Sequence, residues 1–411
     1  RREEQLDQKI LRTNYIQLFF GKHTSAQLKI LFISHLSSRS GAPLLILRLA
    51  RELKRTKDVE VSFLVGSRGS LTDEFSLLGN VLSWPYGKQD IRTRIKDKLV
   101  NGVGRGGWHS RARHINNIKS HIESADVIVI NTTWSIHMLQ ELNVKAKRVI
   151  AYIHELAVMT SIGATPRAMK WLGEISDRIL VPCEFVREFL MNDYAFEENK
   201  IRILKYILPQ DMRLPLKRSD GTAYFTVGAC GILDWRKGYD LFILIAREIV
   251  YTNEIKDIRF LWIGADMNST EYLIFKQDIV KCGLQDYVSV FGISDKVSEY
   301  FSKLDLFILP SREDPYPLVV QEVAQYEVPT VCFKDAGGIP EFVGDDAGIC
   351  VDYLDVRAFC EAVLELKNNP ESRKRMGKMA ANRIKNQNNK EEIANQFLAY
   401  CSENQNRLAT H

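Results

Sequence analysis

The order strand, loop, helix, strand in the last third of the chain constrains the fold more than any other feature. Asp305 to Leu309 is a short apolar run, which is typical of a buried strand. We expect a helix from Pro317, because proline suits the first helical position, and we expect it to end near Gln325, because Pro329 cannot continue it. Thr330 to Phe333 predicts a second buried strand, and the whole unit is typical of a parallel sheet.

Two acidic residues of this unit predict a ligand site. In parallel sheets, ligands bind at the carboxyl ends of strands against helix N-termini, so we expect one at the loop Arg312–Pro317. Asp314 lies on that loop, and Glu322 lies eight positions later on the polar face of the helix. Helix N–H groups suit an anion and carboxylates suit hydroxyls, which together describe a nucleotide-sugar. A turn residue and a solvated helix face explain the pair equally well.

Apolar runs alternate with helical segments on both sides of a polar break at Leu208–Gly221. This alternation predicts an α/β fold of two doubly wound Rossmann-like domains facing across a cleft, with C-terminal helices bridging them. The expected strands are 28–33, 59–65, 126–131, 148–153, 177–181, 200–207, 224–228, 258–263 and 287–291, besides the two above. The expected divisions are an N-terminal tail or helix at 1–27, an acceptor domain at 28–212, a donor domain at 213–385 and a helix at 386–411 that crosses back.

The composition excludes several classes of protein. The chain is 45% hydrophobic and 26% charged, as in soluble globular proteins, and it has no apolar run of about 18 residues that would span a membrane. Its seven cysteines are scattered without a close pair, which argues against a zinc site or a disulfide framework. Such cysteines favour a reducing compartment, so we expect a cytoplasmic protein.

Positive charge is concentrated in residues 88–119. The whole chain carries +5, whereas this segment holds nine Lys or Arg and two Asp, so it contributes +7 and the remainder about −2. It lacks the interleaved aromatic residues of a stacking platform, so we expect no nucleic-acid partner. A surface for anionic lipid or an anionic acceptor, at the inner face of the membrane, is the functional interpretation. A solvated loop is the simpler alternative.

Two other strand ends supply candidate residues in the first half. Gly41 lies in the loop after the first strand, where a doubly wound sheet has its phosphate turn. A single glycine is equally typical of an ordinary strand-to-helix turn. His154 follows the strand 148–153, and a histidine at the carboxyl end of a parallel strand faces the crevice.

A loop of the second half carries two cations. It runs from Gly231 to Gly238 and includes Arg236 and Lys237 just before a helix. Two fixed cations at a helix N-terminus match a diphosphate. A salt-bridged surface loop is the alternative, and it is weakened because this loop and the acidic pair belong to the same domain.

Three motifs together resemble the GT-B glycosyltransferases of family 4, which are retaining enzymes that use nucleotide-sugars. The resemblance extends from the first expected strand to the C-terminus, and the motifs are specific only in combination. They are a Glu-x7-Glu pattern, here Asp314 and Glu322; a Gly-x5-Lys-Gly loop, here Gly231, Lys237 and Gly238; and the turn Gly337-Gly338-Ile339-Pro340-Glu341.

The resemblance implies a role for each matching residue and a nucleotide-sugar as co-substrate, without a cofactor. A ribose contact favours UDP or GDP as the donor nucleotide. No metal is implied, because protein cations can neutralise the diphosphate and no Asp-x-Asp pair is present. The implied roles are Lys237 and Arg236 on the diphosphate, Glu322 on the ribose, Asp314 or Glu313 on the sugar, His154 lining the sugar pocket, Pro317, Leu318 and Val319 at the phosphate-binding helix start, Gly41 and Gly231 near the phosphates, and Gly292 near the base.

Two positions depart from the family pattern. Ile232 stands where the family often has arginine, so one phosphate contact is lost unless Arg236 supplies it. Asp314 is one methylene shorter than the usual glutamate and follows Glu313, which leaves open which of the two points inward.

The resemblance also implies a mechanism and an acceptor. Cations stabilise the departing diphosphate, and its oxygen accepts the proton of the acceptor on the same face, which gives retention. The expected acceptor is a glycan or a lipid-linked molecule in the synthesis of surface polysaccharide or glycoconjugate.

Three other functions compete. A GT-B epimerase or phosphorylase would share the architecture, although no cofactor-bearing lysine of a phosphorylase can be identified. A nicotinamide dehydrogenase is disfavoured because no Gly-x-Gly-x-x-Gly follows the first strand. An inactive protein that binds sugar-nucleotides or acts as a scaffold is motivated by Ile232 and Asp314.

Overall fold

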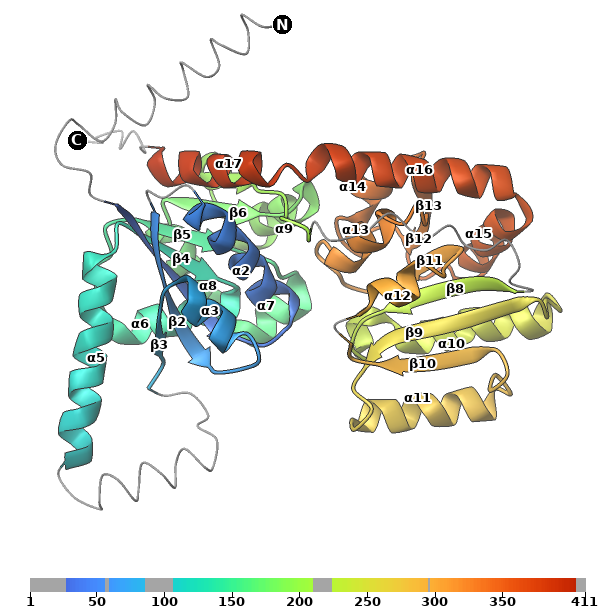
Figure 1. Ribbon diagram of the computed structural model, residues 1–411, viewed down its shortest axis with the longest axis horizontal. Helices are drawn as coiled ribbons and strands as arrows, with labels where there is room; N and C mark the ends of the chain where they lie inside the picture. Colours follow the sequence, from blue (N-terminus) through green and yellow to red (C-terminus); the bar gives the residue numbers. More distant parts are fainter. Residues whose placement is uncertain (1–26, 56–58, 86–105, 210–223, 295, 404–411) are drawn as a thin grey trace, which may run out of the picture.

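The computed structural model describes residues 27–55, 59–85, 106–209, 224–294 and 296–403. It contains two sheets that lie side by side, one of seven strands and one of six (Figure 1). Every strand pairing in both sheets is parallel. The predicted fold class, α/β with two doubly wound Rossmann-like sheets, is confirmed.

The first sheet has the strand order β3-β2-β1-β4-β5-β6-β7. Strands β1 to β3 are added towards one edge of the sheet and β4 to β7 towards the other, so the strand order reverses between β1 and β4. Its strands form from nearly continuous apolar runs because helices cover both faces of a parallel sheet, and every residue of β4 is buried. The strands are β1 (Leu28–Leu36), β2 (Val59–Ser67), β3 (Asn80–Ser83), β4 (Val127–Asn131), β5 (Val149–Tyr152), β6 (Arg178–Val181) and β7 (Ile201–Ile203).

The second sheet has the order β10-β9-β8-β11-β12-β13, and its reversal lies between β8 and β11. Ligands of open α/β sheets bind at such a reversal, beyond the carboxyl ends of the strands. The cation loop follows β8 and the loop that carries Asp314 follows β11, so both loops flank this point. The strands are β8 (Phe225–Cys230), β9 (Ile258–Ala265), β10 (Val288–Gly292), β11 (Leu306–Leu309), β12 (Thr330–Phe333) and β13 (Gly348–Val351).

Side-chain caps mark the start of several connecting helices. Thr165, Ser269, Asp355, Asn369 and Asn389 each accept a hydrogen bond from a backbone N–H of the first turn. The helices are α2 (Gly41–Lys54), α3 (Thr72–Leu78), α5 (Gly106–Ser124), α6 (Ile136–Leu142), α7 (Ala157–Gly163), α8 (Pro166–Ile175), α9 (Glu184–Tyr194), α10 (Tyr239–Arg247), α11 (Thr270–Lys281), α12 (Ser298–Phe301), α13 (Leu318–Ala324), α14 (Ile339–Val343), α15 (Val356–Asn368), α16 (Pro370–Gln387) and α17 (Lys390–Ser402).

The last two helices join the halves of the molecule. Figure 1 shows α16 lying along the second sheet and α17 continuing across to the first. Where α16 gives way to α17, the Asn388 side chain accepts a hydrogen bond from the backbone N–H of Leu208 at 3.0 Å. Leu208 follows β7, so the two chain segments that leave the first half and return to it lie side by side at this point.

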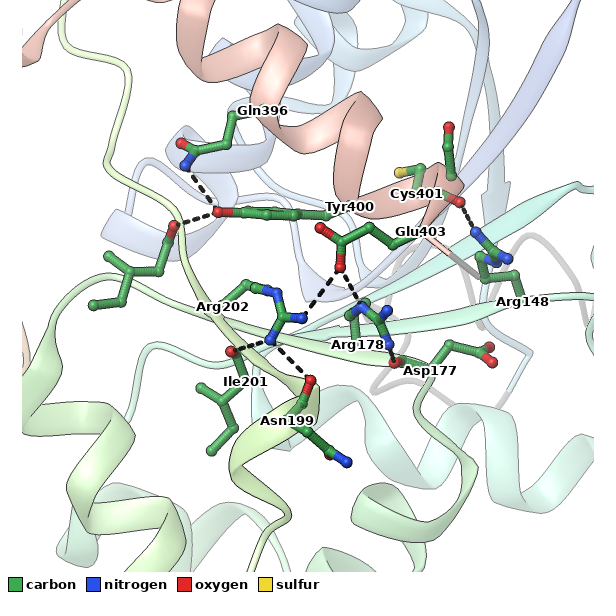
Figure 2. A network of polar contacts seen from close by, with 12 residues as sticks. Arg148, Asp177, Arg178, Asn199, Ile201, Arg202, Gln396, Tyr400, Cys401 and Glu403 are labelled. Atoms are coloured by element: carbon green, nitrogen blue, oxygen red, sulfur yellow. Dashed lines mark hydrogen bonds and ion pairs between the residues drawn. The ribbon is translucent and has the colours of Figure 1, made fainter. Parts of the chain in front are cut away.

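Arginines of the first sheet bind the end of α17 (Figure 2). The Glu403 carboxylate pairs with Arg178 at 2.8 Å and with Arg202 at 3.3 Å. Arg148 donates to the backbone carbonyl of Cys401, and the Tyr400 hydroxyl donates to the carbonyl of Ile203 at 3.3 Å. Cations at a helix C-terminus complement its unpaired carbonyls, so these contacts fix α17 to the first half.

Several boundaries differ from the sequence predictions. The strand expected at 200–207 is only three residues long, because β7 is an edge strand whose pairing with β6 ends at Val181 opposite Ile203. Pro317 is the N-cap of α13 and not its first residue, since its ψ of 124° is extended. Gly41, expected in the loop after the first strand, is the first residue of α2, and Pro43 stands in the first turn of that helix. Short β3 and β13 were not predicted, nor was α5, which occupies the end of the basic segment.

Some predictions lie outside the described residues. These are the tail at 1–26, residues 88–105 of the basic segment and the proposed division between residues 212 and 213. Among the helices that are described, none is long and apolar enough to cross a membrane.

We expect the contact between Glu403 and the arginines to contribute to the stability of the domain arrangement. Glu403→Ala would leave Arg178, whose side chain is 7% exposed, without its counterion. Glu403 is itself 36% exposed, so solvent screens this pair more than a buried pair and less than a surface pair. We therefore expect the free energy of unfolding to fall by about 1–3 kcal/mol. The matched control is Glu361→Ala, which breaks an exposed pair with Arg357 and should change the unfolding free energy by less than about 0.5 kcal/mol. Equal urea midpoints for the two variants would contradict this.

Candidate active site

Asp314 and Lys237 form an ion pair at the reversal point of the second sheet. Asp314 follows β11 and Lys237 follows β8, and their side chains are 7% and 17% exposed. The Ser311 hydroxyl also faces the carboxylate at 3.5 Å. The cation predicted for the diphosphate is therefore neutralised by the acid predicted for the sugar.

Close backbone contacts join the cation loop to the acidic loop. Gly238 has a φ of +67°, and a Cβ there would lie 1.9 Å from the carbonyl oxygen of Pro310, so no other residue fits without moving the loop. The backbone N–H of Arg312 donates to the Arg236 carbonyl at 2.7 Å. In return, the Arg236 guanidinium donates to the Glu313 carbonyl at 3.1 Å. The two loops thus form one rigid unit.

The third motif joins the same unit. Gly337 has a φ of +151°, and a Cβ there would lie 1.8 Å from the Asp314 carbonyl oxygen. The Asp314 N–H donates to the Ala336 carbonyl at 2.7 Å, and the Gly338 N–H donates to the Pro315 carbonyl at 2.8 Å. We call this unit the motif cluster and define it as residues 231–238, 310–317 and 336–341.

The two neighbouring acids point in opposite directions. Asp314 faces Lys237 within the motif cluster. Glu313 faces the first half of the molecule, where it accepts the backbone N–H groups of Val158 at 3.0 Å and Met159 at 3.4 Å at the start of α7. The structure therefore assigns Asp314 to the cation site and makes Glu313 a cap of a helix in the other half.

Glu322 is also bound by the first half. Its Oε1 accepts a hydrogen bond from Nη2 of Arg48 on α2 at 3.1 Å, and both side chains are 16% exposed. Burial raises the pKa of Glu322, while the charge of Arg48 and its hydrogen bond oppose that rise. The residue predicted to bind ribose is thus paired with an arginine that the sequence analysis did not single out.

His154 lies directly after β5 with both ring nitrogens in contact with polar partners. Nε2 is 3.0 Å from Oδ1 of Asn131, and Nδ1 is 3.1 Å from the hydroxyl of Tyr206. Desolvation lowers the pKa of His154 to about 3, so the ring is neutral at pH 7. Tyr206 in turn packs against Tyr316 of the motif cluster, with 5.8 Å between ring centroids.

Glu155 is a buried carboxyl beside His154. Its Oε2 accepts the backbone N–H of His154 at 3.0 Å and that of Thr133 at 3.4 Å. Burial raises the pKa of Glu155 to about 7, against the opposing effect of these hydrogen bonds. The carboxyl therefore holds its proton up to about pH 7, whereas an ordinary glutamate is ionised above about pH 4.5.

The remaining predicted residues lie at the ends of strands or at the starts of helices. Gly41 is the first residue of α2, is exposed and has open space where a Cβ would stand. Gly292 ends β10 beside Met267. Leu318 and Val319 form the start of α13. Gly231 lies against the Lys237 side chain, since a Cβ there would be 3.4 Å from its carbons. In the described part of the chain, no three His, Cys, Asp or Glu side chains are grouped to hold a metal ion.

A match to a known family covers the motif cluster. Residues 219–383 match the family described as glycosyl transferases group 1. The second domain is thus similar to the glycosyl transferases of group 1. The resemblance that the three motifs indicated is thereby confirmed, and the two Rossmann-like sheets of the chain are those of the GT-B fold.

Individual relatives match parts of the chain. The chain is 27% identical over 143 residues to the N-acetyl-α-D-glucosaminyl L-malate synthase of Bacillus anthracis. The matched region covers 34% of this chain and 36% of that protein. The chain is 23% identical over 209 residues to the amylovoran biosynthesis glycosyltransferase AmsD of Erwinia amylovora, covering 50% and 57%. The matched regions thus span about a third to just over half of these relatives.

A solved structure shows the same fold over nearly the whole chain. The Anabaena protein HepE, crystallised with UDP and glucose, superposes with a TM-score of 0.73 at 14% identity. The superposition covers 92% of this chain and 100% of that chain. At this identity the likeness concerns the fold.

Glu341 of the motif turn binds the first half of the molecule, a contact that the sequence did not predict. Its carboxylate accepts the backbone N–H groups of Glu184 at 3.1 Å and Phe185 at 2.7 Å, at the start of α9 in the first half. Beside it, the Cys183 thiol donates to the Pro315 carbonyl at 3.4 Å. The motif turn was identified from its residues, but nothing in the sequence signals which helix its glutamate caps.

The raised pKa of Glu155 predicts a specific dependence of stability on pH. Between about pH 4.5 and 7 the unfolded chain has released a proton that the folded chain retains, so the folded state loses stability as the pH rises through this window. The loss amounts to about 3 kcal/mol over the window. Glu155→Gln removes it, so the wild type should be stabilised relative to the variant on going from pH 7.5 to pH 4.5.

The measurement is urea unfolding of both proteins across that range. The lowered pKa of His154 acts in the opposite direction near the same pH and cancels in the difference. The exposed Glu174→Gln serves as the control, with a curve parallel to that of the wild type. Parallel curves for Glu155→Gln and wild type would show that Glu155 is ionised in the fold.

Proposed function

We propose that this protein transfers a sugar, with retention, from a nucleotide diphosphate donor to a glycan or lipid-linked acceptor in the synthesis of surface polysaccharide or glycoconjugate. The observation that carries the proposal is the motif cluster. It places Lys237, Arg236 and Asp314 on one rigid unit at the reversal point of the second sheet, where α/β folds bind their ligands. The relationship to AmsD, a glycosyltransferase of amylovoran biosynthesis, supports the polysaccharide context.

The donor proposed is a UDP-sugar, with a GDP-sugar as the second possibility. HepE, which has the same fold, was crystallised with UDP and with UDP-glucose. Glu322 would accept hydrogen bonds from the ribose, and the backbone near Leu318 and Val319 would lie against the phosphates. Gly292 would approach the base, and Gly41 the phosphates from the side of the first domain.

Lys237 changes partners in the proposed reaction. Without donor it is neutralised by Asp314; with donor, its ammonium would turn to the diphosphate, and Asp314 would accept hydrogen bonds from sugar hydroxyls. The bond from the anomeric carbon to the diphosphate oxygen breaks, and Lys237 and Arg236 stabilise the charge that develops on that oxygen. The same oxygen takes the proton of the acceptor hydroxyl as the new glycosidic bond forms on the same face. His154, as a neutral ring, would line the sugar pocket.

An inactive donor-binding protein remains the second candidate. Ile232 follows the first glycine of the cation loop, and its side chain is 52% exposed at the place where the family often has arginine. Loss of that cation would weaken stabilisation of the leaving diphosphate more than it weakens folding. Turnover with any sugar donor would exclude this candidate.

The proposed site is tested first by nucleotide binding. UDP, GDP or dTDP at about 100 times its dissociation constant should stabilise the wild type by about 2.7 kcal/mol, measured as a shift in Tm. Lys237→Met combined with Asp314→Asn removes the ion pair without leaving a buried charge, and it should abolish the shift. Lys296→Met, which changes a 77% exposed lysine, should leave it intact.

The same variants separate binding from catalysis. If the wild type transfers sugar, Lys237→Met should lower kcat/KM by about 10²–10³, as for the loss of one stabilising donor to a developing anion. A wild type that no nucleotide stabilises and that transfers no sugar would overturn the proposal. Binding without transfer would instead support the inactive protein.

Peripheral contact with an anionic membrane through residues 88–119 is proposed for delivery of a lipid-linked acceptor. Reversing the charges of Arg92, Arg94, Lys96 and Lys98 to Glu should remove co-flotation with vesicles that contain phosphatidylserine, because each basic residue near such a surface contributes about 1 kcal/mol. Vesicles of phosphatidylcholine alone are the control. Equal flotation of the wild type and the reversed variant would contradict the contact.

A further inference from the structure

Arg48 joins the first domain to a residue of the donor motif. It lies on α2, and its guanidinium reaches α13 of the second domain, where Nη2 donates to Oε1 of Glu322 at 3.1 Å. The two residues are 274 positions apart in the sequence. Neither side chain is a surface group, since each is only 16% exposed.

The pairing leaves part of each side chain without a partner. Arg48 uses Nη2, whereas its Nη1 is buried and has no hydrogen-bond partner in the described structure. Glu322 uses Oε1, and among the described residues no group donates to its Oε2. A ligand with hydroxyl groups could therefore bind Oε2 while Arg48 stays in place.

Arg48 also favours the charged form of Glu322. The carboxyl is largely buried, and burial favours its protonated form, while the neighbouring guanidinium favours the carboxylate. Only the carboxylate offers both oxygens as acceptors. Hydrogen bonds to a charged group are also stronger than those to a neutral one.

We propose that Arg48 is a positioning residue for donor recognition: it holds Glu322 as an oriented carboxylate whose free Oε2 accepts the hydroxyls of the donor ribose. This inference rests on the proposed function, and it adds that ribose recognition needs both domains. The second domain supplies the carboxylate, and the first supplies the cation that keeps it charged. A nucleotide therefore meets a complete ribose site only when α2 and α13 are docked.

The test compares ribose with deoxyribose. The wild type should bind UDP about ten- to a hundred-fold more tightly than 2′-deoxy-UDP in calorimetric titrations, as expected for a hydrogen bond to a charged group. GDP and 2′-deoxy-GDP form the second pair of ligands. Arg48→Met should bring the ratio of the two dissociation constants close to one, and Arg48→Lys, which keeps the charge, should retain most of the preference.

Three controls separate positioning from a merely structural role. Loss of domain packing alone would weaken the ribose and deoxyribose ligands equally and leave their ratio unchanged. Arg51→Met alters an arginine of the same helix that is 51% exposed and pairs with Glu74, and it should keep the ratio of the wild type. Glu322→Gln and the double variant Arg48→Met with Glu322→Gln should show the same reduced ratio, because both substitutions act through one contact.

The outcomes are distinguishable. A wild type that binds none of the four nucleotides overturns the proposed function and this inference with it. Binding with a ribose preference that survives Arg48→Met overturns the role of Arg48 alone. If Arg48→Met does not fold, the double variant Arg48→Met with Glu322→Gln takes its place, because it leaves no buried charge unpaired. A lower ribose preference in this double variant than in Glu322→Gln would contradict the inference.

Discussion

Three carboxylates of the second domain hold the molecule together, and each comes from the part of the chain that carries the donor motifs. Glu313 caps α7, Glu341 caps α9, and Glu322 pairs with Arg48 on α2. A carboxylate that accepts the free N–H groups of a helix start satisfies donors that would otherwise be unpaired at a buried interface. The same segments of the second domain therefore bind the first domain and form the candidate donor site, so the geometry of the site depends on how the domains are docked.

The candidate site is electrostatically self-sufficient without a ligand. Lys237 is neutralised by Asp314, and Arg48 by Glu322, so no cation of these pairs is left buried without a counterion. A donor with two phosphates and a set of hydroxyls supplies the complementary partners, anionic oxygens for the cations and hydroxyl donors for the acids. When the donor binds, the cations and acids exchange each other for groups of the donor, with little change in the total buried charge. The site can therefore be stable when empty and still bind the donor.

The fold was predictable because its signals are local, and the site was predictable only in part because its contacts are not. Apolar runs locate most strands, whereas β7 was predicted too long, since its length is set by where β6 ends and not by its own residues. The cation and acidic loops were identified from their residue types. No local pattern indicates that Arg48 reaches Glu322, that Glu313 points away from Asp314 or that both nitrogens of His154 have polar partners, because each depends on residues brought from distant segments.

The chain passes between the domains near Leu208 and returns near Asn388, and a hydrogen bond of 3.0 Å joins these two points. Two adjacent connections act as a hinge between the domains, whereas a single connection would allow rotation in every direction. Because α17 is fixed to the first domain by Arg148 and Arg178, a rotation of one domain against the other would take place about this point. In such a rotation the displacement grows with distance from the hinge, so the contact between the domains that lies farthest from it would separate most.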